Sequence, residues 1–145
     1  LKELLSDPYF AKSPPKSTGE ELFGGILAER LFGMVTGGGI TLNDLMATAL
    51  MLTVESICLS YEKFIFPEHK VSEVILSGGG CRNAFLVAKL RERLGGLKLT
   101  TTDDYGIPAD AKEAVAFAIL ANECVSGNAG NLSGVTGARR RVPLG

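Results

Sequence analysis

The chain lacks the side chains that a disulfide framework or a zinc site requires. Its three cysteines, Cys58, Cys81 and Cys124, are widely separated and form no CxxC pair, and His69 is its single histidine. An odd number of isolated cysteines does not build a disulfide framework, and one histidine does not complete a zinc site. We therefore expect reduced thiols and no metal site made by these residues.

The chain also lacks an excess of charge of one sign. Its 15 Lys and Arg residues nearly balance 16 Asp and Glu residues, which leaves a net charge of -1. Such a balance gives no broad positive field of the kind that attracts phosphate backbones, so nucleic acid is a poor partner. We expect the single basic run, Arg139-Arg140-Arg141, to be solvated.

A membrane span and a signal peptide are missing from the sequence pattern as well. The longest clearly apolar stretch, "LMATALMLTV" at residues 45–54, is shorter than the roughly 20 residues that a span needs and is followed by Glu55. We interpret it as part of a core helix and expect a cytoplasmic protein without a membrane partner. The sequon at Asn131 is then a chance match.

What is present is enough for one ordinary folded domain. The 145 residues are 46% hydrophobic and 21% charged, and they contain neither a repeat nor a linker, so we predict a single domain over 1–145. The chain opens on "LKELLSDPYF", which resembles the middle of a helix, and it ends without a polar tail. We expect it to be a piece of a longer protein.

The order of predicted elements indicates an α/β fold. Two helices, over residues 17–32 and 41–66, each begin with a capping-box pair, and the glycines of "GMVTGGGI" and Pro67 end them. Next come a strand in "VSEVILS", a helix in "NAFLVAKLRERLGG", a strand in "LKLTTT" and a helix from about 110 to 126 that is apolar nearly all round and should be buried. Short strands separated by helices favour parallel pairing, so helices should pack around a mostly parallel sheet. A last strand is possible near the end. The capping pairs are Ser17 with Glu20 and Thr41 with Asp44.

Three successive glycines, Gly78, Gly79 and Gly80, lie between a predicted strand and a predicted helix in "VILSGGGCRN". A strand, a glycine turn and a helix N-terminus together form an anion site, because free N–H groups point at the ligand and no side chain blocks its approach. Phosphate or ribose is the natural ligand. The alternative is a turn that only reverses the chain.

A dinucleotide site is a second interpretation of the same turn. The spacing Gly78-x-Gly80-x-x-Asn83 matches the first two positions of the dinucleotide fingerprint, and Asp103 follows the next strand where a ribose-binding acid would lie. The third position weakens the match, because asparagine there suits a helix N-cap better than close packing of helix on strand. Glu113 also has two interpretations: it either caps a helix together with Asp110 or accepts hydrogen bonds from substrate hydroxyls.

Four stretches in their order and spacing resemble one family over essentially the whole chain. They are "DPYFAKSPPKSTGEELF", "VILSGGGCRNAFL", "TTTDDYGIPADAKEAVAFAILA" and "GNLSGVTGA", and they look like the C-terminal half of anhydro-N-acetylmuramic acid kinase. The resemblance implies the actin-like ATPase (ribonuclease H-like) fold of the sugar kinase, actin and Hsp70 superfamily. This chain would be the C-terminal nucleotide-binding lobe, and the N-terminal lobe would be absent from it.

The resemblance also implies roles for residues. Gly78, Gly79, Gly80 and Asn83 match the adenosine motif, and Glu113 matches the acid that faces the sugar. Lys16, Ser17 and Thr18 match a family signature with no assigned contact, and Glu20 stands where the family usually has arginine. No catalytic residue is expected in this chain, because the aspartate that activates the attacking water would lie upstream.

The implied reaction uses ATP and Mg²⁺ to open the 1,6-anhydro bridge of the sugar by hydrolysis and to phosphorylate O6. Its product, N-acetylmuramic acid 6-phosphate, belongs to peptidoglycan recycling. The partners would be the anhydrosugar and the missing lobe, with a homodimer as a further assembly. Alternatives are a levoglucosan-type anhydrosugar kinase, a dinucleotide-binding oxidoreductase domain and a non-catalytic interaction module.

Overall fold

The computed structural model describes residues 1–144, which fall into two compact units. The first unit is Leu1–Glu68 and the second begins at His69. Helices and a small parallel sheet confirm the predicted α/β class. The single domain over 1–145 stays a prediction.

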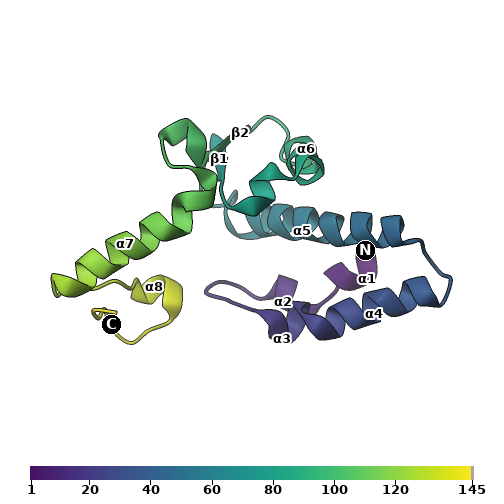
Figure 1. Ribbon diagram of the computed structural model, residues 1–145, viewed down its shortest axis with the longest axis horizontal. Coiled ribbons are helices and arrows are strands. Elements are labelled where there is room, and N and C mark those ends of the chain that lie inside the picture. Colours follow the sequence, from purple (N-terminus) through teal and green to yellow (C-terminus); the bar gives the residue numbers. More distant parts are fainter. Residues whose placement is uncertain (145) are drawn as a thin grey trace. The chain divides into compact units, whose positions relative to one another are not determined.

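The first unit is helical. Its short helices α1, α2 and α3 and its longer helix α4 lead to the 23-residue helix α5. Figure 1 shows α4 and α5 side by side, and α1 and α2 also contact α5. The bounds are Lys2–Leu5 for α1, Pro8–Ala11 for α2, Glu20–Phe23 for α3, Gly25–Thr36 for α4 and Leu42–Phe64 for α5.

The predicted start of α5 is confirmed. The Thr41 hydroxyl accepts a hydrogen bond from the backbone N–H of Asp44 (3.1 Å), and the Asp44 carboxylate accepts one from the backbone N–H of Thr41 (3.1 Å). These two bonds satisfy donors that have no partner inside the helix. The hydroxyl of Thr41 and then its N–H also lower the pKa of Asp44. The helix ends at Phe64, close to the predicted stop at Pro67.

The predicted helix over 17–32 is wrong in its start and its continuity. Gly19, not Ser17, precedes α3, and the carboxylate of Glu21 accepts the Gly19 N–H (2.8 Å). A break at Gly24 then separates α3 from α4, because the backbone turns so tightly that a Cβ there would lie 2.3 Å from the carbonyl oxygen of Glu20. The glycines that follow Thr36 end α4 as predicted.

Helix α5 contributes to the core and is longer than the apolar stretch at residues 45–54. Leu45, Val54 and Cys58 are buried, which confirms a contribution to the core. Residues 45–54 alone are too short for a membrane span, whereas the whole helix is long and apolar enough to cross a membrane by length and composition. Val54 and Cys58 are fully buried, whereas 17% of the most apolar 18-residue window of this helix is buried. One such helix is weak evidence for a membrane span, because the core helix of a soluble protein can have the same length and composition.

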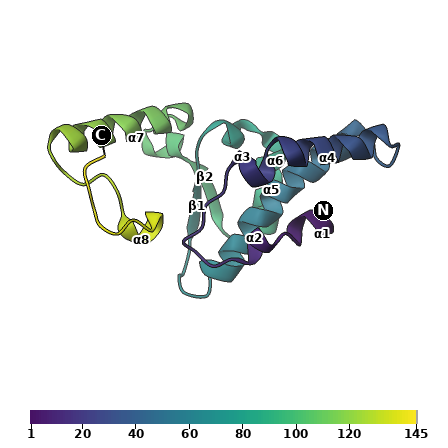
Figure 2. The ribbon, with the colours of Figure 1, turned by 90° about the horizontal axis from the view of Figure 1, so that it is seen from below.

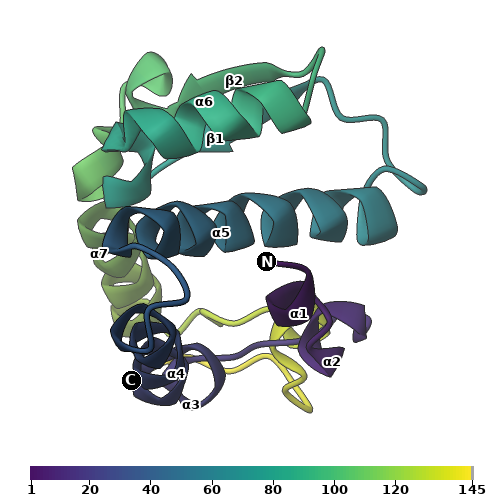
Figure 3. The same ribbon diagram turned by 90° about the vertical axis from the view of Figure 1, so that its right-hand side faces the viewer.

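The second unit contains the predicted parallel sheet. Strands β1 (Glu73–Leu76) and β2 (Lys98–Thr101) pair in parallel from Glu73 opposite Lys98 to Leu76 opposite Thr101. Helix α6 (Ala84–Arg93) connects them, and Figure 3 shows it running along the two strands. Both strands and this helix confirm the predictions from the sequence. The remaining elements are the 3-10 turns η1 (Gly79–Arg82), η2 (Thr102–Tyr105) and η3 (Ala109–Ala111) and the helices α7 (Lys112–Val125) and α8 (Ser133–Thr136).

Helix α7 is present but its predicted burial is wrong. No residue of α7 is buried, and Phe117 and Val125 are 70% and 90% exposed. Its apolar residues face almost every direction, so burial would require other elements to pack on several sides of the helix. Its main contacts are with η3, the turn directly before it, which leaves most of the helix surface exposed.

The end of the described chain is held by a side chain and not by a strand. From Gly137 to residue 144 the described residues form no strand, so the possible last strand is wrong. The buried Asn131 accepts the Val142 N–H (2.7 Å) and donates to the Arg140 carbonyl (3.1 Å). Figure 2 shows that the chain folds back after α8, and these two bonds hold it there. The chance sequon at Asn131 stays a prediction, and Arg139-Arg140-Arg141 is exposed as expected.

Candidate functional site

The glycine turn is fixed on one side by the start of η3. Gly78 has φ of 77°, in the left-handed region that favours glycine, and its N–H donates to the carbonyl of Ala109 (3.0 Å). The Gly78 carbonyl accepts from the N–H of Cys81 (3.2 Å) and from its thiol (2.9 Å). The first glycine is therefore occupied by internal bonds.

The other side of the turn is open. A Cβ placed on Gly79 would meet nothing within 4 Å, and one on Gly80 would touch only the end of Leu86 at 3.5 Å. Gly79 and Gly80 are exposed, and they form the first turn of η1, where a 3-10 helix offers their N–H groups no internal acceptor. A planar or phosphorylated ligand can therefore approach this backbone closely.

Asn83 is the N-cap of α6, as its position predicts. Its side-chain oxygen accepts the Leu86 N–H (3.1 Å), and its own N–H donates to the Gly80 carbonyl (3.1 Å). These bonds join the glycine turn to the helix that follows it.

Asp103 has an internal partner. It lies in η2, directly after β2, and its carboxylate accepts the N–H of Ala109 (3.3 Å). This contact gives Asp103 a role within the fold that needs no ribose. The dinucleotide interpretation loses support, because it relied on this acid and on a fingerprint that Asn83 already broke.

Glu113 lies in the first turn of α7 and is exposed. The predicted cap formed with Asp110 is wrong: Ala111 precedes the helix without a side-chain cap, and Asp110 instead forms an ion pair with Arg82 of η1. This pair and the Gly78–Ala109 bond bring η1 and η3 together. Since η3 leads directly into α7, the structure places the glycine turn beside the helix start that carries Glu113.

Sequence reasoning missed the residues that make this junction. Ala109, Arg82 and Asp110 each bond with residues about 30 positions away, and no local pattern marks such pairs. Ala109 is buried between two polar turns, but a single alanine in a sequence does not by itself indicate a buried position.

Lys16 has contacts within the first unit. Its ammonium group donates to the carbonyl of Tyr9 (3.2 Å) and lies 4.9 Å from the ring centres of both Tyr9 and Phe64. Such contacts stabilise the loop before α3 by hydrogen bonding and cation–π attraction. The Thr18 hydroxyl donates to the Glu21 carboxylate (3.4 Å), so Lys16 and Thr18 both have structural partners.

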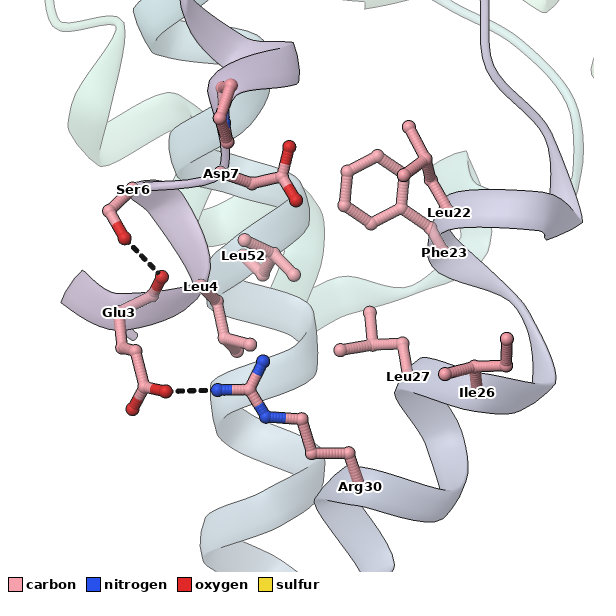
Figure 4. A pocket seen from close by; sticks show the side chains of 11 residues that line it. Glu3, Leu4, Ser6, Asp7, Leu22, Phe23, Ile26, Leu27, Arg30 and Leu52 are labelled. Carbon is pink, nitrogen blue, oxygen red and sulfur yellow. Dashed lines mark hydrogen bonds and ion pairs between the residues drawn. The ribbon is translucent and has the colours of Figure 1, made fainter.

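A pocket of about 360 Å³ lies among α1, α4 and α5 in the first unit. Figure 4 shows Arg30 of α4 reaching Glu3 of α1, with Leu4, Leu27 and Leu52 between the helices. None of the residues predicted to bind nucleotide or sugar lines it. Its side chains therefore support packing of the helices and do not extend the candidate site.

Comparisons with known proteins agree with the sequence motifs. A family model described as anhydro-N-acetylmuramic acid kinase matches residues 1–145. Relatives of that name from Caldanaerobacter subterraneus, Gloeobacter violaceus and Salinibacter ruber are 45%, 44% and 43% identical over 145 residues. Each comparison covers the whole chain and 37%, 37% and 36% of the relative. The chain thus spans a little over a third of the length of these curated relatives.

Proposed function

Because the chain belongs to the anhydro-N-acetylmuramic acid kinase family, we propose that it is the C-terminal nucleotide-binding lobe of such a kinase. The complete cytoplasmic enzyme opens the 1,6-anhydro ring of anhydro-N-acetylmuramic acid by hydrolysis and phosphorylates O6, which yields N-acetylmuramic acid 6-phosphate for peptidoglycan recycling. The names of the relatives support the kinase and its sugar. The fold would be that of an actin-like ATPase lobe.

The open face at Gly79 is the observation that carries the proposal. Gly78, Gly79, Gly80 and Asn83 would form the adenosine side of the nucleotide site, since their backbone is accessible and held in place by Ala109 and Leu86. A side chain at position 79 would fill the space that the nucleotide needs. The residues present therefore fit a nucleotide.

Glu113 would bind the sugar. An exposed carboxylate accepts hydrogen bonds from sugar hydroxyls, and the junction of η1 with η3 puts the start of α7 next to the nucleotide turn. This chain would therefore contribute one wall for each of the two substrates.

Bound ATP with Mg²⁺ supplies the γ-phosphoryl group and neutralises its charge. Residues 1–144 contain no cluster of three or more His, Cys, Asp or Glu side chains that could hold a metal ion. Within this chain, the glycine turn would position the nucleotide and Glu113 would orient the sugar. The aspartate that acts as general base would come from the other lobe.

The missing lobe is the partner we propose for α7. Phe117, Ile119 and Val125 are exposed on this helix, and the relatives contain far more chain than is present here. Burial of these side chains against the other lobe would satisfy the apolar pattern of α7. A homodimer is a further assembly that would cover apolar surface.

Substitution of Gly79 by leucine in the full-length enzyme tests the nucleotide site. We expect calorimetry to show at least about a tenfold loss of ATP affinity, because the leucine occupies the open face. Gly33→Leu is the matched control, since a Cβ on Gly33 in α4 also meets nothing within 4 Å. We expect both variants to keep the parental melting temperature within a few degrees.

Unchanged ATP affinity in the Gly79→Leu variant would refute the adenosine assignment. NAD should fail to displace ATP from the parent enzyme, and displacement by NAD would favour the oxidoreductase alternative. Levoglucosan offered in place of the muramic sugar separates the two anhydrosugar kinases, because we expect turnover with the muramic sugar alone.

A further inference from the structure

We propose that Asp103 is a positioning residue that holds the glycine turn in its nucleotide-binding conformation through Ala109. The inference rests on the proposed nucleotide site and adds a residue outside the glycine motif. Asp103 would not contact the nucleotide. It would act through two consecutive hydrogen bonds across three segments of the second unit.

The two bonds share one residue. The carboxylate of Asp103 accepts the N–H of Ala109 (3.3 Å), and the carbonyl of Ala109 accepts the N–H of Gly78 (3.0 Å). Ala109 is 4% exposed whereas Asp103 is exposed, so the N–H and the carbonyl of Ala109 depend on these two bonds more than the carboxylate does. Loss of the Asp103 bond leaves a buried N–H unsatisfied and frees η3, on which Gly78 depends.

The turn that carries Asp103 is itself fixed, so its carboxylate is held in place. Gly106 closes η2 with φ of 79° and donates its N–H to the Asp103 carbonyl (3.0 Å). The neighbouring Asp104 accepts the Thr101 N–H (2.8 Å) and caps η2. The adjacent acids therefore differ: Asp104 bonds within its own turn, whereas Asp103 reaches the segment that contacts the glycine turn.

Alanine substitution of the two acids in the full-length enzyme tests this difference. We expect Asp103→Ala to weaken ATP binding about fivefold to tenfold by calorimetry while the KM for the sugar stays within about twofold. Asp104→Ala is the comparison: because Asp104 bonds to Thr101 within η2 and not to Ala109, it should lower the melting temperature and weaken ATP binding clearly less than Asp103→Ala. Asp103→Asn should restore affinity, because its side-chain oxygen can still accept the Ala109 N–H.

Hydrogen exchange in the absence of nucleotide separates positioning from direct contact. The amide of Gly78 should exchange about tenfold faster in Asp103→Ala than in the parent, and at the parental rate in Asp103→Asn. If Asp103 touched the nucleotide directly, ATP affinity would fall while exchange at Gly78 stayed unchanged. That result would overturn the inference.

Ala109→Pro provides a second route if Asp103→Ala does not fold. Proline removes the N–H of this residue but keeps its carbonyl. The backbone can accept a proline here, because Ala109 is the first residue of η3 and Pro108 already has the extended φ and ψ (-53° and 131°) that a following proline requires. We expect the same loss of ATP affinity, and no further loss when both substitutions are combined. Additive losses would overturn the inference.

The two proposals can fail separately. If Gly79→Leu weakens ATP binding and Asp103→Ala does not, the inference about Asp103 alone fails. If Gly79→Leu has no effect, the nucleotide assignment fails and the inference fails with it.

Discussion

Among single residues, Glu73 combines three polar contacts in the second unit. Its carboxylate accepts hydrogen bonds from the hydroxyls of Tyr105 (2.5 Å) and Thr100 (2.8 Å) and forms an ion pair with Lys98 (2.9 Å). The Tyr105 hydroxyl bond, followed by Lys98 and Thr100, lowers the pKa of Glu73 from 4.5 to about 2. Glu73 thereby joins β1 to β2 and to η2, the turn that carries Asp103.

Glu73→Gln should change how stability depends on pH. Because the folded-state pKa of Glu73 lies below its ordinary value of 4.5, its carboxylate stabilises the fold above about pH 4.5, and this contribution falls as the pH drops toward 2. We expect the melting temperature of Glu73→Gln to lie below that of the parent at pH 7. The difference should shrink as the pH is lowered from 4.5 to 3.

The control is Glu92→Gln on α6. The Glu92 side chain is 68% exposed and pairs with Lys89 on the surface, so its removal should have little effect at any pH. A Glu73→Gln deficit that stays constant between pH 7 and pH 3 would show that the carboxylate does not stabilise the fold through its charge.

At the level of elements, the cap of α5 has a measurable contribution. Thr41→Ala removes the hydroxyl that accepts the Asp44 N–H, and we expect it to lower the free energy of unfolding by about 1 kcal/mol in urea denaturation. Thr53→Ala is the control within the same helix, because the Thr53 hydroxyl donates to the Ala49 carbonyl, which already lies inside the helix. An equal effect of the two substitutions would contradict the capping role.

Caps illustrate what local sequence can predict. Thr41 with Asp44 and the isolated Asn83 were predicted correctly, because each side chain bonds to a backbone group three residues away. Ser17 with Glu20 has the same spacing but fails, since Gly19 takes the cap position and Glu21 supplies the carboxylate. Spacing alone does not determine which residue adopts the conformation of an N-cap, and Gly24 is flexible enough to interrupt the helix.

Local sequence predicts the glycine motif of the candidate site but not the contacts that hold this motif in place. The glycine turn between β1 and α6 follows from local pattern, whereas the bond between Gly78 and Ala109 joins segments that are distant in sequence. Helix α7 fails for a related reason. An apolar pattern does not show whether another element packs on a helix, and Phe117 is 70% exposed in this chain.

At the scale of the whole molecule, the chain covers only part of the length of its relatives. Each relative aligns along the entire chain, yet the chain makes up 36–37% of the length of the three relatives compared. Phosphoryl transfer requires both substrates to be positioned and the developing charge to be stabilised. The residues available here would supply one wall for each substrate, and no metal cluster occurs among residues 1–144.

We therefore expect the 145-residue chain alone to show no turnover of anhydro-N-acetylmuramic acid with ATP. Phosphorylated sugar would be followed by mass spectrometry, with the full-length enzyme as the active reference and its Gly33→Leu variant as an active control. Because Gly79 and its supporting bonds are all within the chain, some affinity for ATP should remain even without turnover, provided that the isolated chain folds. Formation of the 6-phosphate by the chain alone would refute this division of labour, since the general base would then have to lie within these 145 residues.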